Sequence, residues 1–243
     1  PSLPVRRTGN IMISIVIPSF NEEERIERCL VSLVQQDFPR EEYEIIVVDG
    51  GSKDKTREIA EKYADLVFIQ TSPKVGGARN DGALRARGEI IATTDADTIL
   101  PPDWLSRIRQ DFLDPEVVML YGPVKPIEAT IKNRFYLYLA NSFAHIGYLT
   151  GTILFTLGCN SVFRAEPFKK AGMYRVSDAG DDLEIAHRMR RIGKVKFDRK
   201  LFVSFSMRRY DQFGALKSIY EWFYIVFHGG DAEKYQYTKR EYR

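Results

Sequence analysis

The stretch "ISIVIPSFNEEERIERCLVSLVQQ" (residues 13–36) joins a short apolar run to an amphipathic one, and this junction decides the fold. Residues 13–18 are mostly β-branched and end at a proline, which is typical of a buried strand. In residues 21–36 the apolar positions recur at i, i+3, i+4, i+7 and i+8, which places them on one face of a helix. These positions are Ile26, Cys29, Leu30, Leu33 and Val34. We therefore predict a strand followed by a helix.

The expected start of this helix carries a capping signal. Asn21 is a suitable N-cap residue, and Glu24 follows three residues later, which is the spacing of a capping box. Cys29 lies on the apolar stripe, so we interpret its thiol as part of the core rather than as a reactive group. The chain has 2 cysteines without a C-x-x-C spacing, which argues against a disulfide framework or a thiolate metal site and favours a reducing cytosol.

The alternation of apolar and amphipathic runs continues to residue 95. Residues 43–49, 66–70 and 89–95 predict strands, and residues 55–64 and 77–87 predict helices. Units this short favour an α/β fold with a mainly parallel, Rossmann-like sheet flanked by helices on both faces. Ligands of such sheets bind beyond the carboxyl ends of the strands.

The alternation stops after residue 124. Residues 135–157 carry no charged side chain, but polar residues dilute the run, so we predict a buried or interfacial helix and a following strand rather than a membrane span. Residues 156–166 look like a strand and residues 179–193 like a helix. Two short strands and an aromatic amphipathic helix are expected to close the chain.

The charge is unevenly distributed along the 243 residues, although the formal net charge is only +3. From His187 to the end there are 14 Lys and Arg against 6 Asp and Glu. This basic third suits anionic lipid, a phosphorylated ligand or a plain solvated surface. It matches no nucleic-acid-reading motif, so we expect no nucleic-acid partner.

Two aspartates, Asp95 and Asp97, follow the predicted strand at 89–95. Carboxylates on alternate positions suit Mg²⁺ or Mn²⁺, which also bind the oxygens of a diphosphate. A cation there would neutralise charge on a leaving diphosphate. The alternative is that the pair only forms a turn before a helix at Trp104.

Four motifs, in order and at suitable separations, resemble glycosyltransferase family 2, which has the GT-A fold. They are "IPSFNEEERIERCLVSL", "IIVVDGGSKDKT", "GGARNDGALRARGEIIATTDADTILPPDWL" and "GDDLEIAHRMRRIG". The resemblance extends over residues 13–205. It implies a GT-A fold and the transfer of a sugar from a nucleoside-diphosphate sugar, UDP- or GDP-linked, with Mn²⁺ or Mg²⁺ as cofactor.

The resemblance also assigns donor-binding residues. Pro18, Phe20 and Glu22 match positions that line the base and ribose pocket, and Asp49 matches a carboxylate that binds the base. Arg79 matches an arginine near the donor phosphates and the metal-binding loop; a plain helix-surface arginine is the alternative.

The same motifs assign the metal-binding loop. Asp97 matches the stronger metal ligand, Asp95 lies closer to ribose or sugar, and Ala96 lies alongside the donor. One departure is Gly50, which stands where the family often has a second aspartate.

The last motif supplies the catalytic base of an inverting transfer. Asp182 matches the base position, and Asp181 beside it is a candidate for acceptor or phosphate contacts. Adjacent carboxylates tend to raise the proton affinity of one of them, which suits a base. The alternative is that both aspartates cap a helix and interact with its dipole.

The resemblance suggests a division of the chain. We expect residues 1–11 to be leader or tag residues and residues 12–206 to form the GT-A domain. Within it, residues 12–100 would bind the nucleotide sugar and residues 101–206 would supply the acceptor and catalytic half. Residues 207–243 would form a basic, aromatic C-terminal helical extension.

Two interpretations of this extension stay open. It either lies in a lipid headgroup layer, on the cytoplasmic face of the membrane, or it covers the sheet or forms a homodimer contact. Arg208 and Arg209 could instead reach the donor diphosphate or an acceptor phosphate. The acceptor would be a glycan or a polyprenyl phosphate, and the protein would be cytoplasmic or peripheral on the membrane.

Two rival functions are weighed against transfer. A sugar-phosphate nucleotidylyltransferase would need a glycine-rich, arginine-containing loop after the first strand, where this chain has "PSFNEEER". A non-catalytic nucleotide-sugar-binding subunit would not need Asp182.

Overall fold

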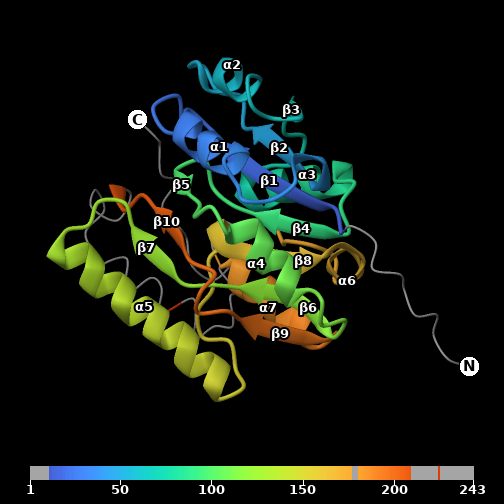
Figure 1. Ribbon diagram of the computed structural model, residues 1–243, viewed down its shortest axis with the longest axis vertical. Coiled ribbons are helices and arrows are strands. Elements are labelled where there is room, and N and C mark those ends of the chain that lie inside the picture. The colour runs from blue at the N-terminus through green and yellow to red at the C-terminus, as the bar shows by residue number, and fades with distance from the viewer. Residues whose placement is uncertain (1–10, 177–179, 209–223, 225–243) are drawn as a thin grey trace, which may run out of the picture.

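The computed structural model describes residues 11–176, 180–208 and 224 (Figure 1). Its centre is a seven-stranded sheet in the order β3-β2-β1-β4-β8-β6-β9. The strands of this sheet are β1 (Ile13–Ser19), β2 (Tyr43–Asp49), β3 (Leu66–Ile69), β4 (Ile90–Thr93), β6 (Val117–Tyr121), β8 (Ser161–Arg164) and β9 (Lys194–Phe197). A smaller sheet has the order β5-β10-β7 and consists of β5 (Thr98–Ile99), β10 (Val203–Phe205) and β7 (Val124–Pro126).

Most neighbouring strands of the main sheet are parallel. β1 pairs with β2 from Ile13 opposite Tyr43 to Ser19 opposite Asp49, and it pairs with β4 on its other side. β8 is the exception because it runs antiparallel to both β4 and β6. The predicted mainly parallel sheet is therefore confirmed, and the carboxyl ends of β1, β2 and β4 meet at one edge.

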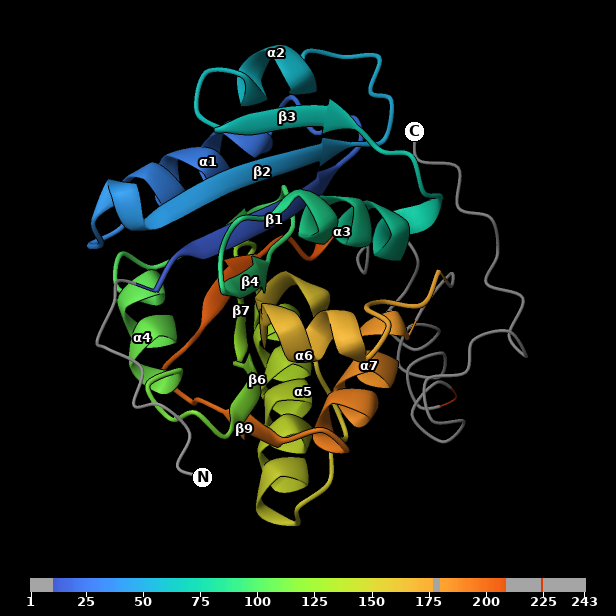
Figure 2. The same ribbon diagram turned by 90° about the vertical axis from the view of Figure 1, so that its right-hand side faces the viewer.

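Helices cover both faces of the main sheet (Figure 2). One face packs against α1 (Ile26–Val34), α2 (Thr56–Ala60) and α4 (Trp104–Asp111). The other face packs against α3 (Lys74–Arg85), α6 (Ala165–Lys170) and α7 (Asp181–Arg190). Two short 3₁₀ turns, Arg40–Glu42 and Gly158–Asn160, complete this part of the chain. The layers are those expected for alternating strands and helices.

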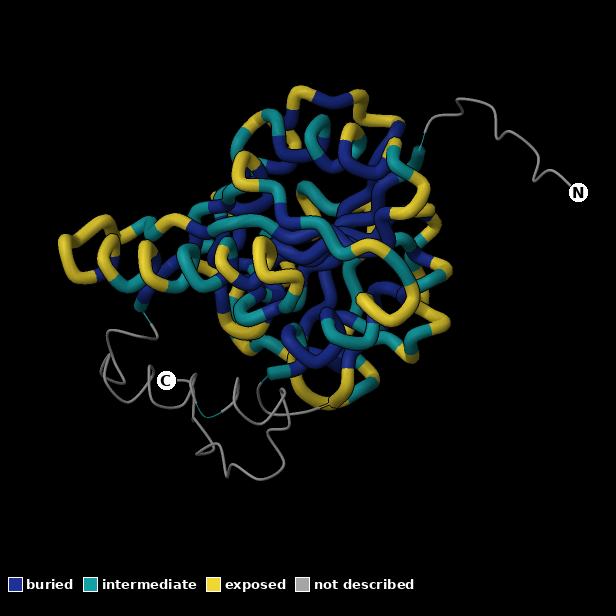
Figure 3. The backbone as a smooth tube through the Cα atoms, turned by 90° about the horizontal axis from the view of Figure 1, so that it is seen from below, coloured by how far each residue is buried: buried dark blue, intermediate teal, exposed yellow. Residues whose placement is uncertain are grey.

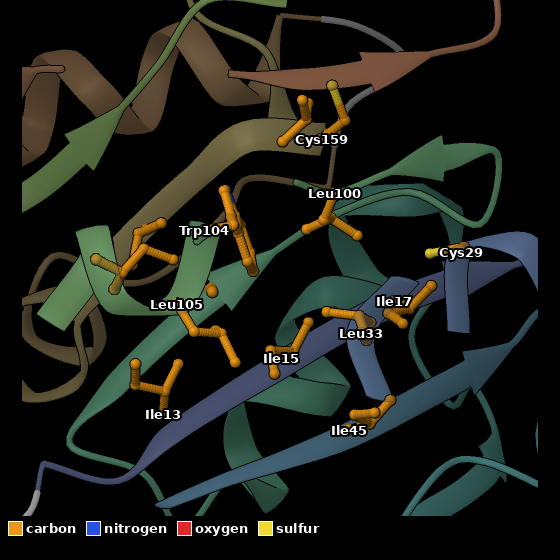
Figure 4. Close-up of a cluster of buried hydrophobic side chains, with 14 of the residues drawn as sticks. Ile13, Ile15, Ile17, Cys29, Leu33, Ile45, Leu100, Trp104, Leu105 and Cys159 are labelled. Carbon is orange, nitrogen blue, oxygen red and sulfur yellow. The ribbon is translucent and has the colours of Figure 1, made fainter. Parts of the chain in front are cut away.

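The alternation of side chains along β1 explains why both faces are apolar. Ile13, Ile15 and Ile17 belong to the core on the α1 and α4 side, whereas Val16 belongs to the core on the α3 side. Figure 4 shows Ile15 and Ile17 beside Leu33 of α1, and Ile13 beside Leu105 of α4. Fully burying each such side chain contributes about 1.5–3 kcal/mol to stability.

The predicted capping box at Asn21 is wrong. Helix α1 begins at Ile26, and its N-cap residue Arg25 makes no capping hydrogen bond with its side chain. Asn21 has a left-handed backbone, with φ of 52°, and its side-chain oxygen accepts a hydrogen bond from the Lys53 amide instead. The physical reason is tertiary: Asn21 joins the loops that follow β1 and β2.

The uncharged run at 135–157 differs from its prediction. It contributes to α5 (Ile131–Leu149), a 19-residue helix that is mainly exposed, with Ile131 at 90% and Leu149 at 69% of their accessible surface. Figure 3 shows the exposed turns of α5 extending from the buried centre. The chain then turns at Gly151, and the next strand, β8, begins only at Ser161. The buried alternative of the prediction is therefore wrong for most of this helix, and the interfacial alternative stays a prediction.

Within residues 11–176 and 180–208, no helix is long and apolar enough to cross a membrane. The two short strands predicted near the end are confirmed as β9 and β10. The predicted C-terminal amphipathic helix lies outside the described residues, apart from Arg208 and Tyr224.

Candidate active site

The loops after β1 and β2 are joined by hydrogen bonds at the edge of the sheet where the carboxyl ends of these strands lie. The Asn21 amide donates to Ser52 Oγ at 2.8 Å, and the Glu22 amide donates to Thr56 Oγ1 at 2.8 Å. The Asn21–Lys53 hydrogen bond completes the contact at 2.9 Å. These bonds satisfy backbone groups that the ends of the strands would otherwise leave unpaired.

Asp49, the predicted base-binding carboxylate, is fully buried at the end of β2. Its Oδ2 accepts hydrogen bonds from the amides of Gly51 and Ser52 at 2.9 and 2.8 Å. Its Oδ1 accepts from the hydroxyls of Ser52 at 2.5 Å and Ser19 at 3.4 Å. In this structure Asp49 therefore fixes the shape of the loop that follows β2.

The other residues predicted for the base and ribose pocket lie beside this loop. Pro18 is half-buried in β1, opposite Val48 of β2. The Phe20 ring is 42% exposed, and a Cβ atom at Gly50 would lie 3.1 Å from it. The glycine that departs from the family pattern thus leaves room for the Phe20 ring.

Glu22 is 5% exposed, so its carboxylate needs compensating charge. The Arg208 guanidinium donates to Glu22 Oε1, and Arg25 Nη1 lies 3.8 Å from Glu22 Oε2. Two cations therefore face this carboxylate.

Asp95, Ala96 and Asp97 form a turn between β4 and β5. The amide of Thr98 donates to the Asp95 carbonyl at 3.1 Å. Asp97 is 8% exposed and Ala96 3%. Helix α4 begins at Trp104 with Asp103 as its N-cap residue, so neither Asp95 nor Asp97 caps that helix.

Arg79, on α3, is buried rather than exposed on the helix surface. Its Nη2 lies 2.8 Å from Asp95 Oδ1, and its Nη1 lies 3.4 Å from Asp181 Oδ2. Burial disfavours the charged form, but Asp95 and Asp181 outweigh this effect and raise the pKa of Arg79 above its usual value. One guanidinium thus connects the Asp95 loop to the start of α7.

A close backbone approach holds this guanidinium in place. A Cβ atom at Gly158 would lie 2.4 Å from the Arg79 guanidinium, so a larger residue fits only if the guanidinium shifts. The Gly158 amide also donates to Asp182 Oδ2 at 3.0 Å. Sequence reasoning missed Gly158, and its only signal was a glycine before a short strand.

Asp181 and Asp182 open helix α7, where the N-cap residue Gly180 has φ of 77°. Asp181 is 5% exposed and paired with Arg79, which gives it an internal partner instead of a free acceptor-facing carboxylate. Asp182 is partly exposed. Burial and the adjacent Asp181 raise the pKa of Asp182 to about 7, as a general base requires.

The buried thiol of Cys159 shows that the predicted residues share one region. Burial first, and then the nearby charges of Asp95, Asp97 and Asp182, raise the pKa of this thiol well above its usual value. The carboxylates assigned to metal and base therefore lie around the same group, instead of on opposite sides of the molecule. Figure 4 shows Cys159 above Leu100 and Cys29 to its right, and all three belong to the same core.

The donor atoms at this edge fit a divalent cation whose remaining ligands come from a diphosphate. Asp95 and Asp97 offer hard carboxylate oxygens, and each already faces a cation, since Arg208 Nε lies 3.8 Å from Asp97 Oδ2. Among the described residues, no group of three or more His, Cys, Asp or Glu side chains is arranged to hold a metal ion. A divalent cation at Asp95 and Asp97 would therefore need further ligands besides these described carboxylates.

Of the two arginines predicted for phosphate contacts, Arg208 lies on Glu22 and beside Asp97. Arg209 lies outside the described residues. Sequence reasoning also missed Glu128, which accepts hydrogen bonds from the Ser206 hydroxyl at 2.8 Å and the Met207 amide at 2.7 Å. No local pattern indicates this contact, because Glu128 is about eighty positions away from Ser206 and Met207 in the sequence.

Comparison with known proteins identifies the class of this fold and site. The model of Glycosyl transferase family 2 matches residues 14–172, and the chain belongs to this family. The poly(ribitol-phosphate) beta-glucosyltransferase of Bacillus spizizenii is 34% identical over 167 residues, which cover 65% of this chain and 26% of that protein. Glycosyltransferase AglE of Haloferax volcanii is 38% identical over 101 residues, 39% of this chain and 33% of that protein. The chain thus spans about a quarter to a third of these relatives.

Solved structures confirm the GT-A-type fold. The mannosyltransferase PcManGT of Pyrobaculum calidifontis, in complex with GDP-Man and Mn²⁺, superposes with a TM-score of 0.66 at 22% identity, covering 82% of this chain and 58% of that chain. TarS of S. aureus superposes with a TM-score of 0.65 at 18% identity, covering 89% and 39%.

Proposed function

We propose that the chain is a metal-dependent, inverting glycosyltransferase that moves a sugar from a nucleoside-diphosphate sugar to a glycan or lipid-linked acceptor. The observation that carries this proposal is the link through Arg79, which joins the Asp95 loop to the Asp181–Asp182 pair. Two sets of carboxylates with different surroundings thus share one edge of the sheet. The names of similar proteins support the substrate class, because they include complexes with GDP-Man and with UDP-GlcNAc.

Residues 12–100 supply the donor half in this proposal. Phe20 offers a half-exposed ring for stacking on the base, and Pro18 and Asp49 shape the pocket around it. Glu22 suits the ribose hydroxyls, because an ionised carboxylate accepts hydrogen bonds. Arg79 holds the Asp95 loop through its ion pair with Asp95 and adds positive charge near the diphosphate.

Asp97 and Asp95 would hold Mn²⁺ or Mg²⁺ through their carboxylate oxygens, and Ala96 would lie alongside the donor. When bound, the cation neutralises charge on the departing diphosphate. The burial of Asp97 strengthens its electrostatic interactions, because the local dielectric is lower than that of water.

Asp182 acts as the general base, from the half formed by residues 101–206. Its carboxylate takes the proton of the acceptor hydroxyl while that oxygen attacks the anomeric carbon; the bond from the anomeric carbon to the diphosphate breaks, and the nucleoside diphosphate leaves. The Gly158 amide fixes one carboxylate oxygen. Proton transfer to a positioned general base typically raises the reaction rate by about a hundred- to ten-thousand-fold.

A lipid-linked acceptor would place the protein on the cytoplasmic face of a membrane. One relative, from Methanococcus voltae, is named as a transferase acting on a dolichyl phosphate sugar. We assign the part of the C-terminal extension that follows Arg208, with its basic and aromatic residues, to this contact. Flotation with anionic liposomes at low salt tests it: protein that stays with the soluble fraction would contradict the assignment.

Calorimetry of UDP and GDP tests the donor site. We expect one of the two to bind in the presence of Mn²⁺ and to bind far more weakly with EDTA. Asp97→Ala should abolish the gain from Mn²⁺, whereas Asp103→Ala, which only loses an ion pair with Arg107 on α4, should bind like the parent. Binding that is equal with and without metal would contradict the proposed metal dependence.

A further inference from the structure

An arginine guanidinium lies beside the carboxylate assigned to the metal. Glu22 and Asp97 are both nearly buried, and they come from loops after different strands, β1 and β4. The Arg208 guanidinium lies between them: it donates to Glu22 Oε1, and its Nε is 3.8 Å from Asp97 Oδ2. Two carboxylates buried near each other need compensating positive charge, and Arg208 shares this role at Glu22 with Arg25.

The small sheet delivers this guanidinium to its position. Strand β10 pairs with β5, the strand that follows directly on Asp97. The Ser206 amide then donates to the Asp97 carbonyl at 3.2 Å. Glu128 holds the next residues through the Ser206 hydroxyl and the Met207 amide. These hydrogen bonds hold the segment that carries Arg208 and so position its side chain at the site.

The contact of Arg208 with Asp97 is weaker than that of a permanent core ion pair. Its side chain is 27% exposed, and its Nε atom is buried without a hydrogen-bond partner among the described residues. The approach to Asp97 at 3.8 Å is electrostatic, because a hydrogen bond needs a shorter distance. A guanidinium held in this way can be exchanged for another cation.

We propose that Arg208 is the resident counter-ion of the metal site and sets the affinity of the site for a divalent cation. Arg208 gives up Asp97 when a divalent cation and the donor diphosphate bind, because two positive charges held close to one buried carboxylate repel each other. This inference rests on the proposed donor site. It differs from a direct contact of Arg208 with the diphosphate, which would leave the affinity for the metal alone unchanged.

The affinity for Mn²⁺ without nucleotide separates these ideas, measured by calorimetry or by the electron paramagnetic resonance signal of free Mn²⁺. Arg208→Gln should bind Mn²⁺ roughly tenfold more tightly than the parent, because a competing cation is removed. Arg191→Gln, which removes an exposed arginine of the same charge after α7, should bind like the parent. An Arg208→Gln protein that binds Mn²⁺ equally or more weakly would overturn the proposal.

A second variant leaves every charge in place and loosens the tether. Ser206→Ala removes the hydroxyl that donates to Glu128, so it should also tighten Mn²⁺ binding, by a smaller factor of roughly two to five. Unchanged Mn²⁺ affinity in a folded Ser206→Ala protein would count against Arg208 as a tethered competitor. If the parent protein binds no nucleotide in the presence of Mn²⁺, the proposed function is contradicted. Failure of the proposed function is therefore distinguishable from failure of the role assigned to Arg208.

Discussion

Two arginines neutralise the carboxylates of this site, and they do so in different ways. Arg79 comes from helix α3, has a side chain that is 6% exposed, and bridges Asp95 and Asp181. Arg208 comes from the segment after β10, has a side chain that is 27% exposed, and bridges Glu22 and Asp97. The difference indicates a permanent structural ion pair on the side of the base and an exchangeable one on the side of the metal.

The largest expected effect is the loss of the Arg79 charge. Arg79→Met should destabilise the protein by about 3–5 kcal/mol, because Asp95 and Asp181 lose the cation that compensates their burial. Urea unfolding measures the change. Arg79→Lys, which keeps the charge but cannot reach both carboxylates in one geometry, should lose less. A loss of stability below that of Arg208→Gln would contradict the comparison.

Gly158→Ala tests the tight approach of the backbone to Arg79. The new Cβ atom would lie 2.4 Å from the guanidinium, which would have to shift away from Asp95 and Asp181, so we expect a loss of about 1–3 kcal/mol. Combining it with Arg79→Ala should give less than the sum of the two effects, because the obstructed group is gone. Strict additivity in urea unfolding would show that the two positions are independent.

The acidic pair beside Arg79 should appear in the pH dependence of turnover. Since the pKa of Asp182 is raised to about 7, its proton stays on at higher pH than on an ordinary carboxyl group, and turnover should fall as the pH drops below that value. Asp181→Asn removes one cause of the shift, so the acid limb should move to lower pH. A limb that stays in place would contradict the influence of Asp181.

The smallest expected effect on stability is that of Arg208→Gln, at about 1 kcal/mol. Glutamine can still donate to Glu22, and Arg25 remains 3.8 Å from the other oxygen of that carboxylate. The same urea experiment as for Arg79 measures it. A loss as large as that of Arg79→Met would mean that Arg208 is a fixed part of the fold and not an exchangeable cation.

Local patterns predicted the parts of this structure that depend on neighbours in the chain. The period of apolar residues in 13–36 gave β1 and α1, and the family motifs brought Asp95, Asp97 and Asp182 to one region. Asn21 failed as a cap because its partners, Ser52 and Lys53, come from another loop.

Contacts between distant residues were beyond such patterns. Arg208 and Glu22 are 186 positions apart, and their pairing depends on how β10 joins the small sheet. The uncharged segment at residues 135–157 suited either a buried or an interfacial helix, and no local signal indicated that α5 extends from the body of the protein. The role of Gly158 could not be predicted either, because it depends on where the Arg79 side chain of α3 lies in the folded protein.

The most direct test compares Asp97→Asn with Asp182→Asn in the same two measurements. A thermal-shift panel with Mn²⁺ first selects the nucleotide sugar, because binding to the native state raises apparent stability. We predict that Asp97→Asn loses Mn²⁺-dependent donor binding, whereas Asp182→Asn keeps it and loses at least about a hundredfold in sugar transfer. An Asp182→Asn protein that transfers sugar at the parent rate would contradict the account.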